Sequence, residues 1–409
     1  MTRFFSRFRN EDWMATLIGL ALTVLILALP SFVPRFPASL ATPGAWVALG
    51  GMFLLTLAGS MFGLIPLGIA VRRFVVAFVA VFALAALAQT VSAWNPVKTL
   101  GLESVFFSVL FGLLIRNTVG LPRWLEPAVR SEYYIKIGLV LLGTSVLFGE
   151  IMKAGFFGIA QSVVVVFSVW YFTFWLASRM KLDKEMGVML ASAVSICGVS
   201  AAIATCGAIK GDSRKLSFVV SLVLVVAVPM ILIMPGLAKL MGLPEDMAGA
   251  WIGGTIDTTG AVAATGAIYG EVALQTSTIV KFSQNVLLGV AAFLISIYWS
   301  YSKKEVTEEK PTLKVIWLRF PKFVLGFVAA SLVFSFCVAP EVVSDAKPIL
   351  KNIQGMWFAL AFMSIGLETD FKSLITSENR RSTYAFLGAQ AFNVVFTLLV
   401  AWILFGLIA

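Results

Sequence analysis

The sequence contains no histidine, only three cysteines and few charged residues. Histidine is the usual partner of a serine or cysteine nucleophile and the commonest metal ligand. Its absence excludes a Ser–His or Cys–His catalytic pair within the chain and argues against the usual zinc and iron sites. Cys197, Cys206 and Cys337 lie in apolar surroundings and form no CxxC pair, which argues against a disulfide framework. We therefore expect no enzymatic activity, no resident cofactor and no metal centre.

The low charge goes together with high hydrophobicity. Of the 409 residues, 13% are charged and 59% are hydrophobic, and the mean hydropathy is +0.95, whereas about a quarter of the residues of a soluble domain are charged. The net charge of +10 comes from Lys and Arg that gather between apolar runs, which is the positive-inside pattern of membrane proteins. The composition predicts an all-α polytopic membrane protein with no nucleic-acid partner. The lack of a GxxxxGK[ST] motif argues against an ATP-driven pump.

Thirteen apolar segments have about the length of a membrane span, which takes about 20 helical residues. In chain order they are Trp13–Leu29, Ala45–Ile65, Phe74–Trp94, Leu102–Ile115, Tyr134–Phe148, Phe156–Ala177, Gly187–Ile209, Leu216–Leu240, Ala248–Tyr269, Thr276–Ser300, Phe323–Ala339, Ile353–Leu367 and Tyr384–Ile408. The first segment follows three arginines and is longer than the apolar part of a typical signal peptide. We expect an uncleaved first span, a cytoplasmic N-terminus and a multi-pass protein of the cell (inner) membrane.

The distribution of basic residues supports this orientation, with one exception. Lys210, Arg214 and Lys215 would lie on the outer side if every segment crossed the membrane. The exception disappears if Gly187–Ile209 and Ala248–Tyr269 are re-entrant hairpins, because the loop then moves to the inside and all later loops keep their sides. We favour thirteen spans and keep the two hairpins as the alternative.

Two stretches rich in small residues nearly repeat each other within the apolar segments. They are Ser200–Asp212 and Thr259–Glu271. Broken helices at membrane depth leave backbone groups free to hold a solute, so glycine-interrupted apolar segments indicate a transporter binding site. A second similarity, between Leu142–Phe148 and Ile365–Phe371, implies a different register, so the two similarities cannot both mark one internal repeat.

Asp257 is the carboxylate placed most clearly inside an apolar segment. An ionised Asp at the centre of a span costs about 2.5–3.5 kcal/mol, so it needs a compensating role. We expect it to carry a proton or sodium ion; the alternative is that it caps a helix that begins near Gly260. Lys281, with Asn285 nearby, is expected to pair with Asp257 or attract an anion, or else to extend to the membrane interface. Asp257, Lys281 and Asn285 are the predicted ion-coupling residues.

The first small-residue stretch contains a candidate anion site. Gly198, next to Cys197, permits the helix to unwind, and the N–H groups of a helix that begins near Ser200 would attract an anion. The alternative is a seam of small residues that only allows close helix packing. The recurrence of the same composition around Gly260 supports the site, and adds Thr258, Thr259 and Gly260 to its candidate residues.

Four motifs, taken in order, resemble a known family. They are Ser195–Ala201, Asp257–Thr259 with Tyr269-Gly270 downstream, Val280-Lys281 and Ile365–Phe371. From about Arg72 onward the chain resembles the YeiH-type sulfate exporter family, which is similar to the cation/proton antiporter and bile-acid transporter group. The resemblance implies two inverted five-helix repeats whose discontinuous helices cross near the midplane, here Gly187–Ile209 and Ile353–Leu367. It adds Ile365 and Gly366 to the substrate-binding residues.

The implied organisation has three accessory spans in residues 1–95, a first repeat in 96–245 and a second in 246–409, with a polar cytoplasmic loop at 301–321. The chain departs from the family at two positions. Ile256 stands where relatives often carry a histidine before the aspartate, and Gly207 where they tend to have a proline. These departures leave open the substrate and the coupling ion.

The predicted function is secondary active transport of a small anion, sulfate-like or a sulfonate, coupled to H⁺ or Na⁺ by alternating access. One alternative is a cation/proton antiporter with Asp257 as the carrier, and another is a passive anion channel. The expected partners are the anion and the lipid bilayer, and the assembly considered is a homodimer.

Overall fold

The computed structural model of the chain describes residues 10–37, 40, 42–94, 104–146, 148–209, 211–302, 317, 320–370 and 380–408. Over these residues the fold is entirely helical, and seven helices are long and apolar enough to cross a membrane. The predicted all-α polytopic membrane class is therefore confirmed. Most of the predicted polar loop 301–321, and Lys210, lie outside the described residues.

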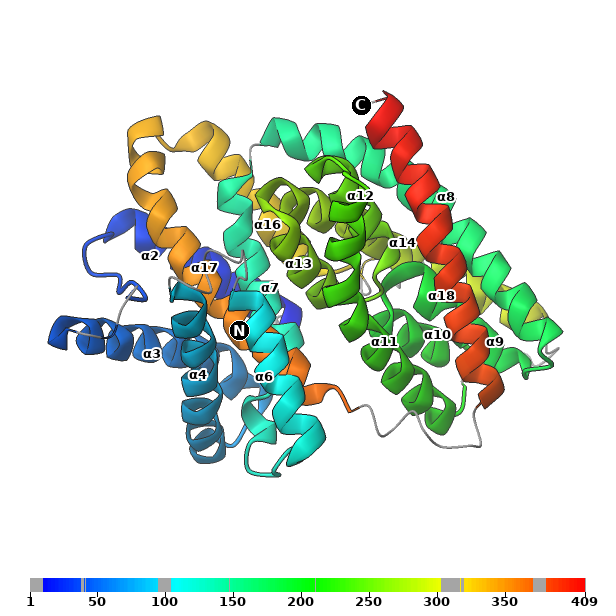
Figure 1. The fold of residues 1–409 in the computed structure, drawn as a ribbon, viewed down its shortest axis with the longest axis horizontal. Coiled ribbons are helices and arrows are strands. Elements are labelled where there is room, and N and C mark those ends of the chain that lie inside the picture. The colour runs from blue at the N-terminus through cyan, green and yellow to red at the C-terminus, as the bar shows by residue number, and fades with distance from the viewer. Residues whose placement is uncertain are drawn as a thin grey trace, which may run out of the picture. The chain divides into compact units, whose positions relative to one another are not determined.

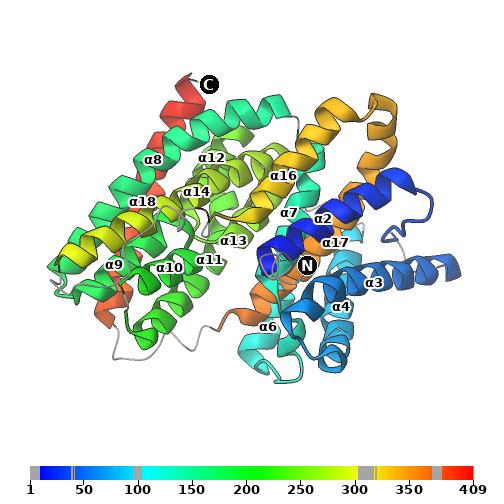
Figure 2. The same cartoon turned by 180° about the vertical axis from the view of Figure 1, so that it is seen from behind.

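The helices form two compact units, and each unit is assembled from two separated parts of the chain (Figures 1 and 2). The first unit contains Met1–Ile151 and Pro321–Glu368, and the second contains Met152–Phe320 and Thr369–Ala409. The first unit contains α2 (Glu11–Ala28), α3 (Pro43–Leu64), α4 (Val71–Ala93), α6 (Ser104–Thr118), α7 (Ser131–Leu142), α16 (Lys322–Leu332) and α17 (Pro340–Glu368), with short helices η1 (Ile65–Leu67), η2 (Glu126–Ala128), η3 (Gly143–Ser145) and η5 (Val333–Cys337). This division differs from the contiguous blocks expected from the sequence.

In the first unit, α7 is buried and packs against α2, α16 and α17, while α17 also packs against α6 and α4. A Cβ atom on Gly366 of α17 would lie 2.5 Å from the carbonyl oxygen of Val109 on α6, so glycine allows the two backbones this close approach. Ile353–Leu367, predicted to be a broken helix, instead lies within the continuous helix α17. Of its two glycines, Gly366 serves close packing, and neither has the positive φ that would reverse the chain.

The second unit contains two helical hairpins between long helices. Its elements are most of α8 (Phe148–Arg179), α9 (Lys184–Ser192), the π-helix η4 (Ala193–Cys197), α10 (Val199–Ile209), α11 (Ser213–Leu240), α12 (Glu245–Thr255), α13 (Thr259–Tyr269), α14 (Glu271–Ser302), α18 (Arg380–Ala401) and the terminal π-helix η8 (Trp402–Ile408). Figure 1 shows α12 and α13 as short neighbouring helices close to α14 and α11.

The first hairpin, hairpin 1, consists of α9, η4 and α10, and the chain reverses at Gly198. Its two ends lie together, because Lys215 Nζ on α11 is 2.7 Å from Asp183 Oδ1 and 3.3 Å from Glu185 Oε2. A helix that crossed the membrane would place these ends on opposite sides. Hairpin 1 is therefore re-entrant, and Arg214 shares the side of the start of α9.

The second hairpin, hairpin 2, consists of α12 and α13, joined by the extended residues around Ile256. The Tyr269 hydroxyl at the end of α13 donates a hydrogen bond to the Leu243 carbonyl just before α12. The Glu245 carboxylate accepts the backbone N–H groups of Val272 at 2.9 Å and Ala273 at 3.3 Å. The start and the end of hairpin 2 therefore lie together as well.

The two hairpins form an inverted pair. Hairpin 1 ends at the start of α11 and hairpin 2 begins just after its end, so the hairpins enter from opposite ends of this helix, and their tips meet at Gly198 and Asp257. The second arm of each hairpin packs against the long helix that follows the other, α10 against α14 and α13 against α11. The stretches Ser200–Asp212 and Thr259–Glu271 are these second arms, so their similarity marks the repeat.

The re-entrant alternative for the two segments is thus confirmed, and the structure differs from the thirteen-span interpretation at these positions. The loop with Arg214 and Lys215 no longer contradicts the charge bias, because it lies at the same end as Lys184.

Spin labels at Lys184 and Arg214 test hairpin 1 directly. In a background with the three cysteines replaced by alanine, we expect pulsed electron paramagnetic resonance to give a separation below about 25 Å, whereas residues 184–209 as one continuous helix would separate the two sites by about 39 Å. A single distance peak near the longer value would contradict the hairpin.

Candidate functional site

The tips of the two hairpins touch at Gly198. This residue has φ of +58° and ψ of −109°, in the region that side chains rarely adopt. A Cβ atom here would lie 2.7 Å from Cγ1 of Val223 and 3.1 Å from Cβ of Asp257. Both the sharp reversal and the close approach of the second tip therefore require glycine.

Lys281 of α14 is buried between the tips, with 1% of its surface exposed. Its Nζ donates to the carbonyl oxygen of Ile196 at 2.6 Å and to Oε1 of Gln284 at 2.8 Å. Gln284 Nε2 donates in turn to the carbonyl oxygen of Gly254 at 3.0 Å. The interpretation of Lys281 as an interfacial lysine is therefore wrong: it satisfies the end of the first arm of hairpin 1, and through Gln284 it is linked to the first arm of hairpin 2.

Two amide side chains of α18 also donate hydrogen bonds to backbone carbonyl groups at the hairpin tips. Asn393 Nδ2 donates to the carbonyl oxygens of Val194 at 3.2 Å and Thr255 at 3.1 Å, and Gln390 Nε2 donates to Thr255 at 3.0 Å. Thr397 orients Asn393 by donating to its Oδ1 at 2.7 Å. Both amides therefore form hydrogen bonds between helices at the tips, and the sequence by itself did not place them at the site.

At the tips, the carbonyl ends and the N–H ends of the helices differ in how far side chains satisfy them. The carbonyl ends of the first arms, η4 and α12, receive the side-chain donors just described. The second arms, α10 and α13, begin at the tips, and the first N–H groups of a helix have no acceptor within it. Thr258 caps one of these groups by accepting the N–H of Ala261 at 3.3 Å, while Gly198 has no side chain to cap α10. Ser200, in the first turn of α10, is exposed.

Asp257 lies between α12 and α13 with 1% of its surface exposed, and neither carboxylate oxygen has a hydrogen-bond donor among the described residues. The N-cap of α13 is Thr258, so the helix-capping interpretation of Asp257 is wrong. The carboxylate interacts electrostatically with Lys281 but forms no ion pair with it within 4.0 Å, again considering only the described part of the chain.

Further oxygen atoms around this carboxylate lack donors. Asn285 Nδ2 donates to Oγ1 of Thr259 at 3.1 Å, but Asn285 Oδ1 and the Thr255 hydroxyl are buried without a partner among the described residues. Buried polar atoms are normally paired, so open oxygen atoms on Thr255, two residues before Asp257, and on Asn285, which binds Thr259 two residues after it, suit a proton or a small cation.

The structure thus brings most predicted site residues into the second unit around the tips. Cys197 ends η4, Gly260 lies in the first turn of α13, and both are buried. Ile365 and Gly366 are the exceptions, because they belong to α17 of the first unit. Gln284, Gln390 and Asn393 were missing from the predicted site, and their signal was an amide in an apolar helix.

Comparison with known proteins gives a consistent family. A family model described as "Conserved hypothetical protein 698" matches residues 76–385. A UPF0324 membrane protein of Rhodopirellula baltica is 38% identical over 378 residues, which cover 90% of this chain and 70% of that protein. A UPF0324 membrane protein of Nitratidesulfovibrio vulgaris is 38% identical over 387 residues, covering 91% of this chain and 65% of that protein, so the chain spans less than two thirds of this relative's length. No solved structure matches.

Replacing Gly198 tests the contact between the tips. We expect Gly198→Ala to lower the free energy of unfolding by about 1–3 kcal/mol, because the new side chain adds backbone strain and overlaps with Val223 and Asp257. Gly236→Ala on α11 is the matched control, since no atom lies within 4 Å of its added Cβ. Thermal unfolding in detergent measures both, and equal stability of the two variants would contradict the close contact.

Replacing Asn393 tests the support of the carbonyl ends. Asn393→Leu keeps the approximate volume but leaves the Val194 carbonyl without this donor, so we expect a loss of about 1–3 kcal/mol in stability. Gln275→Leu on α14 serves as control, because this half-buried amide makes no hydrogen bond to another described residue. Denaturation in mixed micelles compares them, and a loss no larger for Asn393→Leu than for the control would rule out the supporting role.

Proposed function

The chain belongs to the family described as conserved hypothetical protein 698, the UPF0324 or YeiH family of membrane proteins, and from this premise we propose that it is a secondary active transporter of small anions. The printed names of the relatives specify a membrane protein and no substrate. The substrate class rests on the site in the second unit and on the resemblance to sulfate exporters.

The proposal rests on a difference between the carbonyl ends and the N–H ends of the helices at the tips. Donors from α14 and α18 occupy the carbonyl ends of the first arms. The N–H ends of α10 and α13, with their positive dipole ends, remain for a ligand, and such ends favour anions. The buried ammonium group of Lys281 adds positive charge, and Ser200 supplies an exposed hydroxyl next to the first of these ends. A compact tetrahedral oxyanion, sulfate or a sulfonate group, suits this arrangement.

Asp257 supplies the coupling step in this proposal. A buried carboxylate without hydrogen-bond donors favours binding of a proton or sodium ion, which cancels its charge. Cancelling that charge strengthens the attraction of the site for an anion, so the two ligands would bind cooperatively. Asn285 and Thr255 offer further oxygen atoms to the cation, and no other cofactor or catalytic chemistry is needed.

The opposed hairpins suggest how access could alternate. The two hairpins enter from opposite ends of α11, so a movement of one hairpin tip would open the site to one side only. The basic residues at the ends of hairpin 1 favour the cytoplasm for that side, together with a cytoplasmic N-terminus and location in the cell (inner) membrane. A homodimer remains the assembly that we expect.

A cation/proton antiporter is the second candidate, because the open oxygen atoms of Asp257 also suit a carrier that binds cations alone. It predicts that a pH or sodium gradient is dissipated without any anion. A passive channel, by contrast, would give anion conductance in planar bilayers and no uphill accumulation.

Uptake of labelled sulfate into proteoliposomes with an imposed pH or sodium gradient tests the proposal. We expect Asp257→Asn to abolish the dependence on the gradient and to lower uphill accumulation at least tenfold, since Asn carries no charge to be cancelled. Ser200→Ala should weaken anion affinity about fivefold, the effect of losing one hydrogen bond of about 1 kcal/mol.

Asp246→Asn is the matched control, because this carboxylate lies at the far end of hairpin 2, away from the tips, and its amide can still accept the N–H of Met247. It should transport like the wild type. If Asp257→Asn and Ser200→Ala both leave the flux and its gradient dependence unchanged, the assignment of this site is wrong.

A further inference from the structure

A basic cavity of about 910 Å³ lies in the first unit, apart from the hairpin tips. Four arginines line it: Arg72 and Arg73 at the start of α4, Arg123 before η2, and Arg130 before α7. Glu126 is the one carboxylate among the described lining residues. The excess of positive charge favours an anionic ligand.

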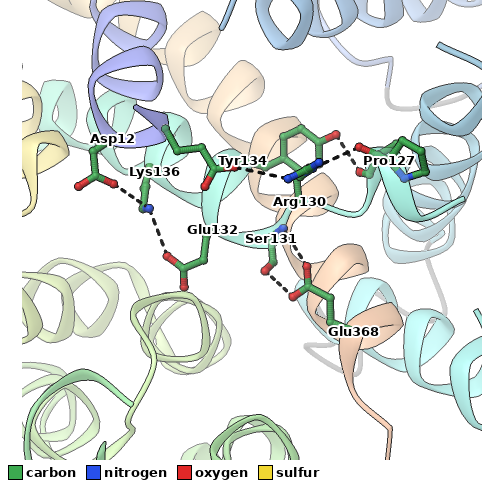
Figure 3. Close-up of polar contacts among 10 residues, drawn as sticks. Asp12, Pro127, Arg130, Ser131, Glu132, Tyr134, Lys136 and Glu368 are labelled. Atoms are coloured by element: carbon green, nitrogen blue, oxygen red, sulfur yellow. Dashed lines mark hydrogen bonds and ion pairs between the residues drawn. The ribbon is translucent and has the colours of Figure 1, made fainter. Parts of the chain in front are cut away.

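Three of these arginines, Arg72, Arg73 and Arg123, have guanidinium groups that bind no other described residue, and Arg130 differs from them. Figure 3 shows Arg130 directed towards Pro127, whose carbonyl oxygen accepts from Nε at 3.3 Å, and Arg130 Nη1 also lies 3.9 Å from the Glu11 carboxylate. Arg72, Arg73 and Arg123 are exposed and make no ion pair or hydrogen bond with any described residue. Guanidinium groups of this kind bind phosphate through paired N–H donors.

A strip of exposed apolar side chains on α4 adjoins the arginines of the cavity. Val76 lines the cavity and follows Arg72 by four residues, so both lie on one face of α4, and Val79 continues that face. Val76 and Val79 are 57% and 51% exposed, and Trp124 at the cavity is 53% exposed. Tryptophan at the end of an apolar surface is typical of the membrane interface, where the headgroups lie.

We propose that this cavity binds the phosphate headgroup of an acidic phospholipid. Arg72, Arg73 and Arg123 hold the phosphate, Trp124 packs at the level of the glycerol, and one acyl chain follows Val76 and Val79 along α4. A free inorganic anion would engage the arginines but would leave the adjoining apolar strip without a role. The four arginines belong to segments that the charge bias assigns to the cytoplasmic leaflet, where acidic lipids exert their attraction.

Native mass spectrometry and thermal unfolding of the full chain test this site. The protein is transferred into nanodiscs of phosphatidylcholine, with or without phosphatidylglycerol, and compared with the triple variant Arg72→Gln/Arg73→Gln/Arg123→Gln. We expect phosphatidylglycerol to raise the Tm of the wild type and to remain bound after release from the nanodisc. The triple variant should lose at least half of the shift and the retained lipid, while its Tm in phosphatidylcholine stays near that of the wild type.

The control Arg179→Gln/Lys181→Gln/Arg214→Gln removes the same charge from exposed positions of the second unit, and should keep both effects. The variant with lysine at positions 72, 73 and 123 should keep the charge but bind less lipid than the wild type, because lysine lacks the paired donors. Equal stabilisation by phosphatidylcholine, or an equal loss in the control variant, would overturn the site. An equal Tm shift with inorganic phosphate alone would assign the cavity to a free anion and overturn the lipid proposal.

Discussion

The buried hydrogen bonds that Lys281 and its neighbours make to backbone carbonyls are the interaction on which the second unit depends. Two chain reversals at the depth of the apolar helices expose carbonyl groups that water cannot reach, and each unsatisfied group there costs several kcal/mol. Lys281 meets this demand at Ile196, Gln284 at Gly254, and Asn393 at Val194 and Thr255. Because α14 and α18 both reach the tips, the hairpins, α14 and α18 form one hydrogen-bonded assembly.

The same hydrogen bonds also determine which polar and charged groups remain open at the tips. Once the carbonyl ends are occupied, the groups that remain near the tips are N–H groups of α10 and α13 and one carboxylate without donors among the described residues, and the ammonium group that occupies one carbonyl adds positive charge. In the proposed transporter, structural support and anion binding would therefore use opposite ends of the broken helices. The buried carboxylate of Asp257 interacts electrostatically with Lys281, but no ion pair joins the two within 4.0 Å in the described part of the chain.

The first unit is built on a different principle. Its helices are continuous around the site of close α6–α17 packing, and its small residues bring backbones together rather than breaking them. Several of its polar groups join different helices: Ser131 Oγ of α7 donates to Glu368 of α17 at 2.6 Å, and Lys136 of α7 pairs with Asp12 of α2 at 2.8 Å (Figure 3). The same composition of glycine and alanine thus has two structural meanings in one chain, and periodicity alone does not distinguish them.

The sequence by itself determined the membrane class, the positions of the apolar segments, and Asp257 as a carboxylate within an apolar segment, because composition and segment length report directly on burial in lipid. It left the place of Lys281 open between the interior and the interface, and the structure decided it. It also contained the inverted repeat, in the similarity of Ser200–Asp212 to Thr259–Glu271. Tertiary structure alone decided that these segments are hairpins, since a span and a re-entrant hairpin of equal length have the same hydropathy. The distinction rests on contacts between residues far apart in sequence, such as Lys215 with Asp183, and so does the identity of the groups that receive Lys281.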